Sequence, residues 1–301
     1  MRIRLGTRDI LEGIIEMEYS KFLTAPKSPV LAITLSLTTL IGMYPSLSLA
    51  SEWSETFLGY RYGTSYREPA HSENISKNIV TVQHSSGYKY GTNFFNLDIL
   101  LSDSNDPAAG GGGGATEAYF VYRHNLSLSA ATGKTLKLGP IRDIGITAGF
   151  DLNTKNDAFG PRKCKLAIGP TLSFDVPGFL NISLLYQTES NRNGIVGTNV
   201  HFDDTYDVNL AWGIPFSFGL PAKFKGFADY IGPKGRDGFG ADTKAETLIE
   251  TALMFDVGSV VGTEGVFSTG IGYQYWHNKF GNAPGVGTQA SVPQLEMEVH
   301  F

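Results

Sequence analysis

The chain ends in residues 292–301, VPQLEMEVHF, where apolar and ionic residues alternate from Leu295 onward. A period of two predicts a β-strand with one apolar and one polar face. Leu295 and Met297 share the apolar face, and Glu296 and Glu298 lie on the other. A soluble sandwich would bury the apolar face against a second sheet, whereas a transmembrane barrel would turn it toward lipid.

The same alternation recurs along most of the chain after residue 50. Strands of roughly ten residues are the length that crosses a bilayer at a tilt, and about a dozen are present. The segments are SETFLGYRYGT, NIVTVQHS, NFFNLDILLS, EAYFVYRHNLSLS, DIGITAGFDL, KCKLAIGPTLSF, LNISLLYQTE, TYDVNLAWGI, AKFKGFADYIG, TLIETALMFDV, FSTGIGYQYWHN and the C-terminal stretch. An even number of strands predicts that the first strand begins and the last strand ends on the same side of the membrane.

The connections between these segments alternate between long and short. The long ones are polar or glycine-rich: SDSNDPAAGGGGGAT, NTKNDAFGPRK, ESNRNGIVGTNVHFDD, GPKGRDGFGADTK and GNAPGVGTQA. The short ones are SSGYK, DVPGF, PFSFGLP and GSVVGTEG, with ATGKTLKLGP longer than a tight turn needs. We therefore predict an all-β fold over residues 51–301, a transmembrane antiparallel β-barrel of 12 strands with long external loops and short periplasmic turns.

Composition agrees with this class and excludes others. The 301 residues include 36 Gly, 14 Tyr and 19 Phe, and no stretch after residue 50 is apolar enough for a membrane-spanning helix. A net charge of −5 gives no basic surface for nucleic acid. The single Cys164 excludes an internal disulfide, and no Cys/His cluster has metal-binding spacing. We expect no metal and no cofactor.

Residues 1–50 are typical of a targeting segment. Lys21 and Lys27 precede the apolar run VLAITLSLTTLIG, and the small residues Ser48 and Ala50 stand where a signal peptidase would cleave. We predict a signal peptide over residues 1–50, with translation starting at Met1 or at Met17. A retained membrane anchor is the alternative.

Several segments resemble the Tsx-type nucleoside-specific channel-forming proteins of Gram-negative outer membranes. They are YRYGTSYREP (60–69), GYKYGTNFFNLDILLSD (87–103), AYFVYRHNLS (118–127), ADYIG (228–232) and YWHNKFG (275–281). The resemblance covers most of residues 51–301 and implies a 12-stranded monomeric barrel in the cell outer membrane. It also implies a narrow channel that passes nucleosides over aromatic and ionisable residues. The PKGRDGFGADTK and pentaglycine loops do not follow that family's pattern.

The strand registers assign side chains to the two faces of the barrel. Tyr60, Tyr62, Trp212, Tyr273 and Tyr275 are expected on the lipid side, in the interfacial girdles. The predicted channel lining, which would bind the passing solute, comprises Phe57, Arg61, Asp98, Glu117, Tyr119, Arg123, Lys165, Asp207, Lys225, Phe227, Asp229, Glu250 and Trp276.

This lining can be interpreted in two ways. Mixed charges beside aromatic rings suit a neutral, flat, polar solute such as a nucleoside, bound by stacking and hydrogen bonds. The same charges could instead form ion-pair ladders that brace the wall. Small inward residues indicate open space rather than a plugged lumen: Gly145, Thr147, Gly149, Ala167, Gly169, Ser183, Ala211, Gly213, Gly270 and Gly272.

The leading hypothesis is passive, solute-selective transport without enzymatic activity. No plug or docking box is evident before the first strand, which favours passive passage. One alternative is a barrel-embedded lipolytic enzyme using His84 and Ser86, since a Ser nucleophile needs a His base. The other is a non-conducting structural or receptor barrel. The expected partners are outer-membrane lipid, small solutes, and the barrel-assembly machinery, which would read the last strand ending in Phe301.

Overall fold

A computed structural model describes residues 51–301; the predicted signal peptide, with its alternative start at Met17, lies outside the described residues. The described part is an antiparallel sheet. Its strands are β1 (Trp53–Tyr66), β2 (Ile75–Tyr88), β3 (Gly91–Ser102), β4 (Thr116–Ser127), β5 (Ile141–Lys155), β6 (Cys164–Phe174), β7 (Phe179–Asn193), β8 (Thr198–His201), β9 (Thr205–Phe218), β10 (Leu220–Ile231), β11 (Glu246–Asp256), β12 (Phe267–His277) and β13 (Ala290–His300).

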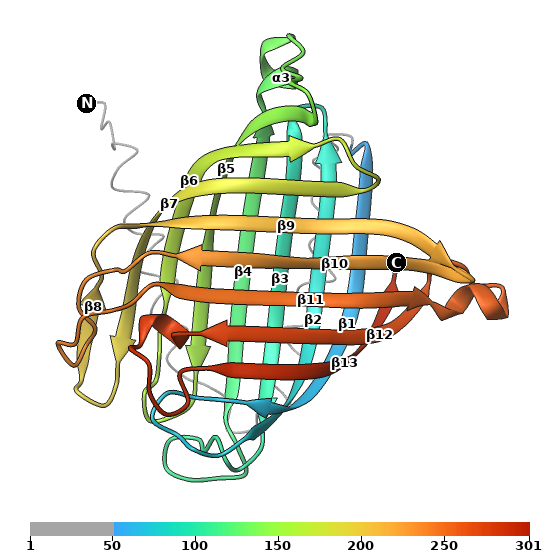
Figure 1. The fold of residues 1–301 in the computed structure, drawn as a ribbon. Coiled ribbons are helices and arrows are strands. Elements are labelled where there is room, and N and C mark those ends of the chain that lie inside the picture. Colours follow the sequence, from blue (N-terminus) through green and yellow to red (C-terminus); the bar gives the residue numbers. More distant parts are fainter. Residues whose placement is uncertain (1–50) are drawn as a thin grey trace, which may run out of the picture. The chain divides into compact units, whose positions relative to one another are not determined.

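The sheet closes on itself. Each main strand pairs with its sequence neighbours, β6 pairs with β7, and β1 pairs with β13. The four-residue β8 pairs only with β7 and belongs to a connection, so the closed ring contains the 12 predicted strands. In Figure 1, β2 to β5 cross β9 to β13 in projection, as tilted strands on opposite walls of a barrel do.

The connections follow the predicted alternation. Residues 67–74, 103–115, 156–163, 194–204, 232–245 and 278–289 join strands at one end, which we call the long-loop end. The opposite, short-turn end holds both termini of the barrel and residues 89–90, 128–140, 175–178, 219 and 257–266. The unexpectedly long turn ATGKTLKLGP follows directly from the helix α3 (Leu128–Thr132) and includes the last two residues of that helix, which projects from the barrel in Figure 1.

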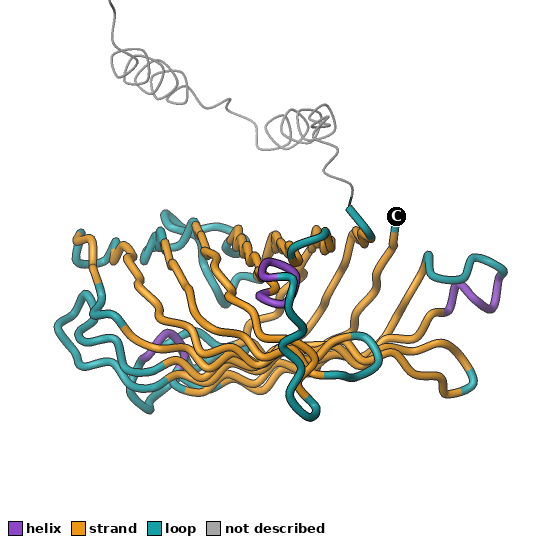
Figure 2. Tube along the Cα trace, turned by 90° about the horizontal axis from the view of Figure 1, so that it is seen from above, coloured by secondary structure: helices purple, strands orange, loops and turns teal. Residues whose placement is uncertain are grey.

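In the part of the chain that the structure describes, helical turns are confined to connections. Besides α3, this part contains η1 (Val257–Val261) and η2 (Lys279–Gly281), and Figure 2 shows these short segments among strands and loops. Within residues 51–301, no helix is both long and apolar enough to cross a membrane.

The two faces of each strand differ as the alternation predicts. In β13, Leu295 is 60% exposed on the outer face, whereas Glu296 is 5% exposed on the inner face. Tyr62 and Tyr273 are likewise exposed on the outside, and Trp212 has the outward register but is covered by packing against Phe224. Hydrocarbon can accept such an outer face because closure leaves the described ring no free strand edge.

The inward glycines have a different role from the predicted one. A Cβ on Gly149 would lie 2.7 Å from Cδ of Arg123, and one on Gly272 would collide with Oε1 of Glu296. At Gly149 the backbone oxygen of Tyr122 and the Arg123 side chain both occupy the space of a Cβ, and at Gly272 the Glu296 carboxylate occupies it. The two glycines accommodate the polar filling of the lumen and do not widen it, so the interpretation of these two residues as open space was wrong.

A charge on the outer face should destabilise the barrel. Leu295→Arg, at the middle of β13, is expected to lower the free energy of unfolding by about 2–4 kcal/mol, because the guanidinium would lie at hydrocarbon depth. Unfolding in urea from lipid vesicles measures this change. Ser291→Arg, on the same face at the long-loop end, is the control and should cost about 1 kcal/mol or less. Equal losses at both positions would contradict the membrane-facing assignment.

Candidate functional site: a charged lumen with an aromatic mouth

An ion pair joins distant strands across the lumen. Arg61 on β1 contacts Asp98 on β3 at 2.5 Å and also binds Glu250 on β11. Because β12 and β13 separate β11 from β1 in the ring, the Arg61 side chain must cross interior space. Asp98 accepts a further hydrogen bond from Thr81, and Glu250 accepts one from Gln274. The contacts narrow the bore at this level.

A second group of charges crosses the lumen nearer the short-turn end. Lys225 on β10 binds Glu298 on β13, and its ammonium lies 4.7 Å from the centre of the Phe57 ring. Lys223 reaches Glu55 on β1 at 3.1 Å. His300 lies 3.2 Å from both Glu55 and Glu298 and links the two pairs.

A third group occupies the wall formed by β4, β5 and β6. Asp151 accepts from Arg123 at 2.6 Å, from Lys165 at 2.8 Å and from the hydroxyl of Tyr119 at 3.1 Å. Two cations therefore share one buried carboxylate. Beside it, the hydroxyls of Thr147, Thr171 and Ser183 form a chain, with oxygen separations of 2.6 and 2.8 Å.

Aromatic side chains gather toward the long-loop end. Trp276 at the end of β12 and Phe280 in the following loop make an edge contact, with ring centroids 5.0 Å apart. The Lys163 ammonium lies 5.9 Å from the Phe280 ring and 5.8 Å from the Tyr119 ring. Phe280 has φ 62°, a left-handed conformation unusual for a residue with a bulky side chain.

Glu246 holds this aromatic pair in place. Its Oε1 accepts hydrogen bonds from Nε1 of Trp276 at 2.6 Å and from the backbone N–H of Phe280 at 3.1 Å. Strained backbone persists where neighbouring contacts fix it, often at functional sites. The Phe280 ring is 36% exposed and so remains available for contact.

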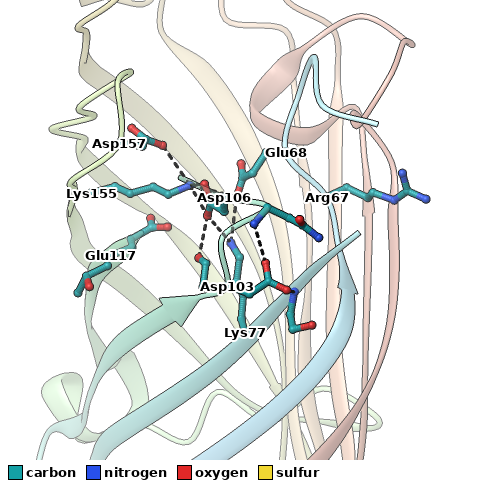
Figure 3. Close-up of polar contacts among 12 residues, drawn as sticks. Arg67, Glu68, Lys77, Asp103, Asp106, Glu117, Lys155 and Asp157 are labelled. Carbon is teal, nitrogen blue, oxygen red and sulfur yellow. Dashed lines mark hydrogen bonds and ion pairs between the residues drawn. The ribbon is translucent and has the colours of Figure 1, made fainter. Parts of the chain in front are cut away.

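Charged side chains tie the long loops together above the lumen, and we call this set the mouth cluster. It comprises Glu68, Lys77, Asp106, Lys155, Asp157 and Lys279. Glu68 lies 2.9 Å from Lys77, 3.3 Å from Lys279 and 3.5 Å from Lys155. Figure 3 shows Glu68 and Asp106 between the Lys77 and Lys155 ammonium groups. Four connections are joined here, those after β1, β3, β5 and β12.

All thirteen predicted lining residues lie on the inward face. The structure brings Arg61, Asp98 and Glu250 into one group and Tyr119, Arg123 and Lys165 into another. Phe57, Lys225, Asp207, Asp229, Glu117, Phe227 and Trp276 occupy other inward positions, with Glu117 accepting a hydrogen bond from Asn153. Whether these side chains contact a solute remains a prediction.

Lys163, Phe280 and the mouth cluster were not predicted from the sequence. Lys163 and Phe280 lie in connections, where the two-residue period of a strand cannot assign a side chain to the inner or outer face. The available signal for Phe280 was its place in the YWHNKFG segment.

The proposed lipolytic pair is not assembled in the described chain. His84 and Ser86 lie on the outer face of β2, two residues apart. Nδ1 of His84 lies 2.7 Å from Oγ1 of Thr56, and its ring stacks against Phe95, with ring centroids 5.5 Å apart. No hydrogen bond joins His84 to Ser86 in residues 51–301, so the His84 base is not positioned to activate this hydroxyl.

These features define the class of the protein. A closed antiparallel barrel with an apolar outer face and an ionic inner face is the architecture of Gram-negative outer-membrane proteins, and this chain is a transmembrane β-barrel of that class.

Comparisons with solved structures return barrels at low sequence identity. The KdgM porin in complex with disordered oligogalacturonate is 9% identical, with a TM-score of 0.44, covering 81% of this chain and 99% of that one. The NanC porin is 12% identical, with a TM-score of 0.45, covering 80% and 98%. The translocator domain of the autotransporter NalP from Neisseria meningitidis is 11% identical, with a TM-score of 0.44, covering 90% and 96%. No protein-family profile and no curated protein matches the chain.

Removing the central arginine should destabilise and widen the lumen. Arg61→Met leaves Asp98 and Glu250 without a counter-charge, and we expect a loss on the order of 3 kcal/mol in the free energy of unfolding. Urea unfolding in detergent micelles measures this loss. The control is Arg236→Met, which breaks an exposed ion pair with Asp242 in a loop and should change the free energy of unfolding by about 0.5 kcal/mol or less. A loss no larger than this control would show that the Arg61 contacts do not support the wall.

The mouth cluster should make stability depend on pH. Burial holds the pKa of Lys279 at about 8, below its ordinary value of 10.5, with Glu68 opposing this effect and Lys77 reinforcing it. Since the unfolded chain binds more protons between these values, the free energy of unfolding should rise from pH 8 to pH 10.5, by at most about 3 kcal/mol. Lys279→Met should abolish the rise, and Lys244→Met, at an exposed position in the preceding long loop, should retain it. The same rise in both variants would contradict the assignment.

Proposed function

We propose that this protein is an outer-membrane channel for the passive, selective diffusion of small polar solutes, with nucleosides as the preferred class. The observation that carries the proposal is the make-up of the lumen. Ion pairs cross it between non-adjacent strands, and the side chains of Arg123, Lys225 and Glu250 still keep 21–22% of their surface exposed. A bore lined this way is narrow and wet, and its lining would filter solutes.

The aromatic mouth supports a flat, polar solute. Trp276 and Phe280 offer ring faces, and Tyr119, Lys163 and Glu246 offer polar groups beside them. A nucleobase stacks on an aromatic ring with about 1–3 kcal/mol and presents several hydrogen-bonding atoms. The resemblance to Tsx-type channels points to the same solutes. That relationship and the nucleoside preference are hypotheses.

A non-conducting barrel is the second candidate. The observation that favours it is the set of ion pairs across the lumen, which could close the bore to solutes. Conductance distinguishes the two. Refolded residues 51–301 in planar bilayers should give small unitary steps under the channel proposal and none under the closed-barrel one. Adenosine and thymidine should block the steps saturably, whereas glucose should not.

The aromatic mouth gives a sharper test. Phe280→Ala should raise the nucleoside concentration needed for half block by roughly tenfold, because it removes one stacking face. Phe239→Ala is the matched control, since it removes an exposed phenylalanine from another long loop. Conductance without nucleoside block would retain the pore and reject the nucleoside. Equal effects of the two variants would reject the aromatic mouth as the binding site.

A further inference from the structure

Several inward carboxylates, including those of Glu117, Glu246 and Glu296, have no ionic partner in the described chain, and two more lie on neighbouring strands. Asp207 on β9 is 1% exposed, and Asp229 lies on the neighbouring strand β10. Within residues 51–301, no side-chain nitrogen of Lys, Arg or His lies within 4.0 Å of either one. The cations of the facing wall, Arg123 and Lys165, are bound to Asp151 instead.

The strand registers bring a third polar side chain to the same place. Asp207 lies opposite Leu185 on β7 and opposite Ile231 on β10. Gln187 is therefore two residues along β7 from the position facing Asp207, and Asp229 is two residues along β10. Residues at this diagonal spacing share a face, so Asp207 lies within side-chain reach of Gln187 on one side and of Asp229 on the other. Gln187 is level with Thr205 and Asp229 with Asn209, so the three residues form an inward row with Asp207 at its centre.

The hydrogen-bonding capacity of this group is largely unused. Gln187 is fully buried, and neither its Oε1 nor its Nε2 has a partner. Oδ1 of Asp207 is also buried without a partner. Asp229 accepts one hydrogen bond, from Nδ2 of Asn209 at 2.6 Å. A buried carboxylate without a partner is costly, and buried polar atoms in folded proteins are almost always satisfied.

The chemistry of these atoms indicates what would satisfy them. Two carboxylates and an amide oxygen attract a positive charge and accept hydrogen bonds. Among the described residues, no group of three or more His, Cys, Asp and Glu side chains is arranged to hold a metal ion. These few protein atoms do not supply the complete oxygen shell of a tightly bound divalent cation. They can contact an ammonium group, or an alkali ion that keeps part of its water shell.

We propose that Asp207, with Asp229 and Gln187 on either side of it, is the centre of a binding site for a monovalent cation, either an alkali-metal ion or the ammonium group of a solute, and that this site makes the lumen cation-selective. The proposal rests on the proposed channel function. It assigns to the long-loop half of the lumen a charge preference that the nucleoside proposal does not require. Cations would then be concentrated beside the aromatic mouth.

The reversal potential in a KCl gradient tests the proposal on refolded residues 51–301. The wild-type channel should favour potassium over chloride, and Asp207→Asn should reduce the permeability ratio by roughly fourfold or more. A change of about fourfold is the effect of one charge on an ion about 5 Å away in water, and a less polar environment makes the effect larger. Asp229→Asn should act in the same direction. Adding n-butylammonium shows which kind of cation the site binds. If n-butylammonium blocks the wild-type conductance, and blocks Asp207→Asn more weakly, the site binds an ammonium group. If it leaves the wild-type conductance unchanged while potassium selectivity is retained, the site binds an alkali ion.

Asp204→Asn is the matched control, because it removes the same charge three residues earlier at an exposed position bound to Tyr186. It should leave the permeability ratio unchanged. A permeability ratio near one in the wild type would overturn the proposal, as would an equal fall in Asp207→Asn and Asp204→Asn. An unchanged ratio in Asp207→Asn would also overturn it, and is the result expected if the carboxyl groups of Asp207 and Asp229 are protonated. The absence of any conductance would refute the proposed channel function. Failure of that function can therefore be distinguished from failure of the cation-site proposal, in which the channel conducts without cation selectivity.

Discussion

Closure of the hydrogen-bonded ring is the constraint on which the rest of the structure depends. Hydrocarbon offers no partner to a backbone N–H or C=O group, so every strand must find one on each side. The pairing of β1 with β13 supplies the last set of these bonds. Once the ring is closed, side chains must point alternately to lipid and to the lumen. The apolar outer face and the ionic inner face follow from that geometry.

The lumen solves a second physical problem, which is how to place many charges in a confined space. Its ion pairs join strands that are not neighbours, as Arg61 does with Glu250. Glycines at positions such as Gly149 and Gly272 let the long side chains lie flat against the wall. The filling is therefore polar, ordered and tied to the wall at several levels. Asp207 and Asp229 are among the inward carboxylates outside these pairs, since the cations Arg123 and Lys165 are bound to Asp151.

The sequence predicted the barrel far better than it predicted the site. Alternation is a local property, so each strand and its two faces could be identified from segments such as that around Leu295 and Glu296. The strand count and the order of long and short connections followed in the same way. Partners across the lumen could not be predicted, because the contact between Arg61 and Glu250 depends on tilt and shear. Phe280 and Lys163 lie in connections, where no periodicity applies, and Gln187 carries no charge that would single it out.

The seam between β1 and β13 also bears on how the barrel comes into being. Each other pairing in the ring joins strands that follow one another in the sequence, so hairpins can form locally and at little entropic cost. The seam alone must join residues more than two hundred positions apart, such as Phe57 and His300. Until the last eleven residues of β13 are in place, both β1 and β12 present unpaired edges. A sheet that lacks β13 would therefore keep two unpaired strand edges, and the pairing of this strand with both β1 and β12 is what closes the ring.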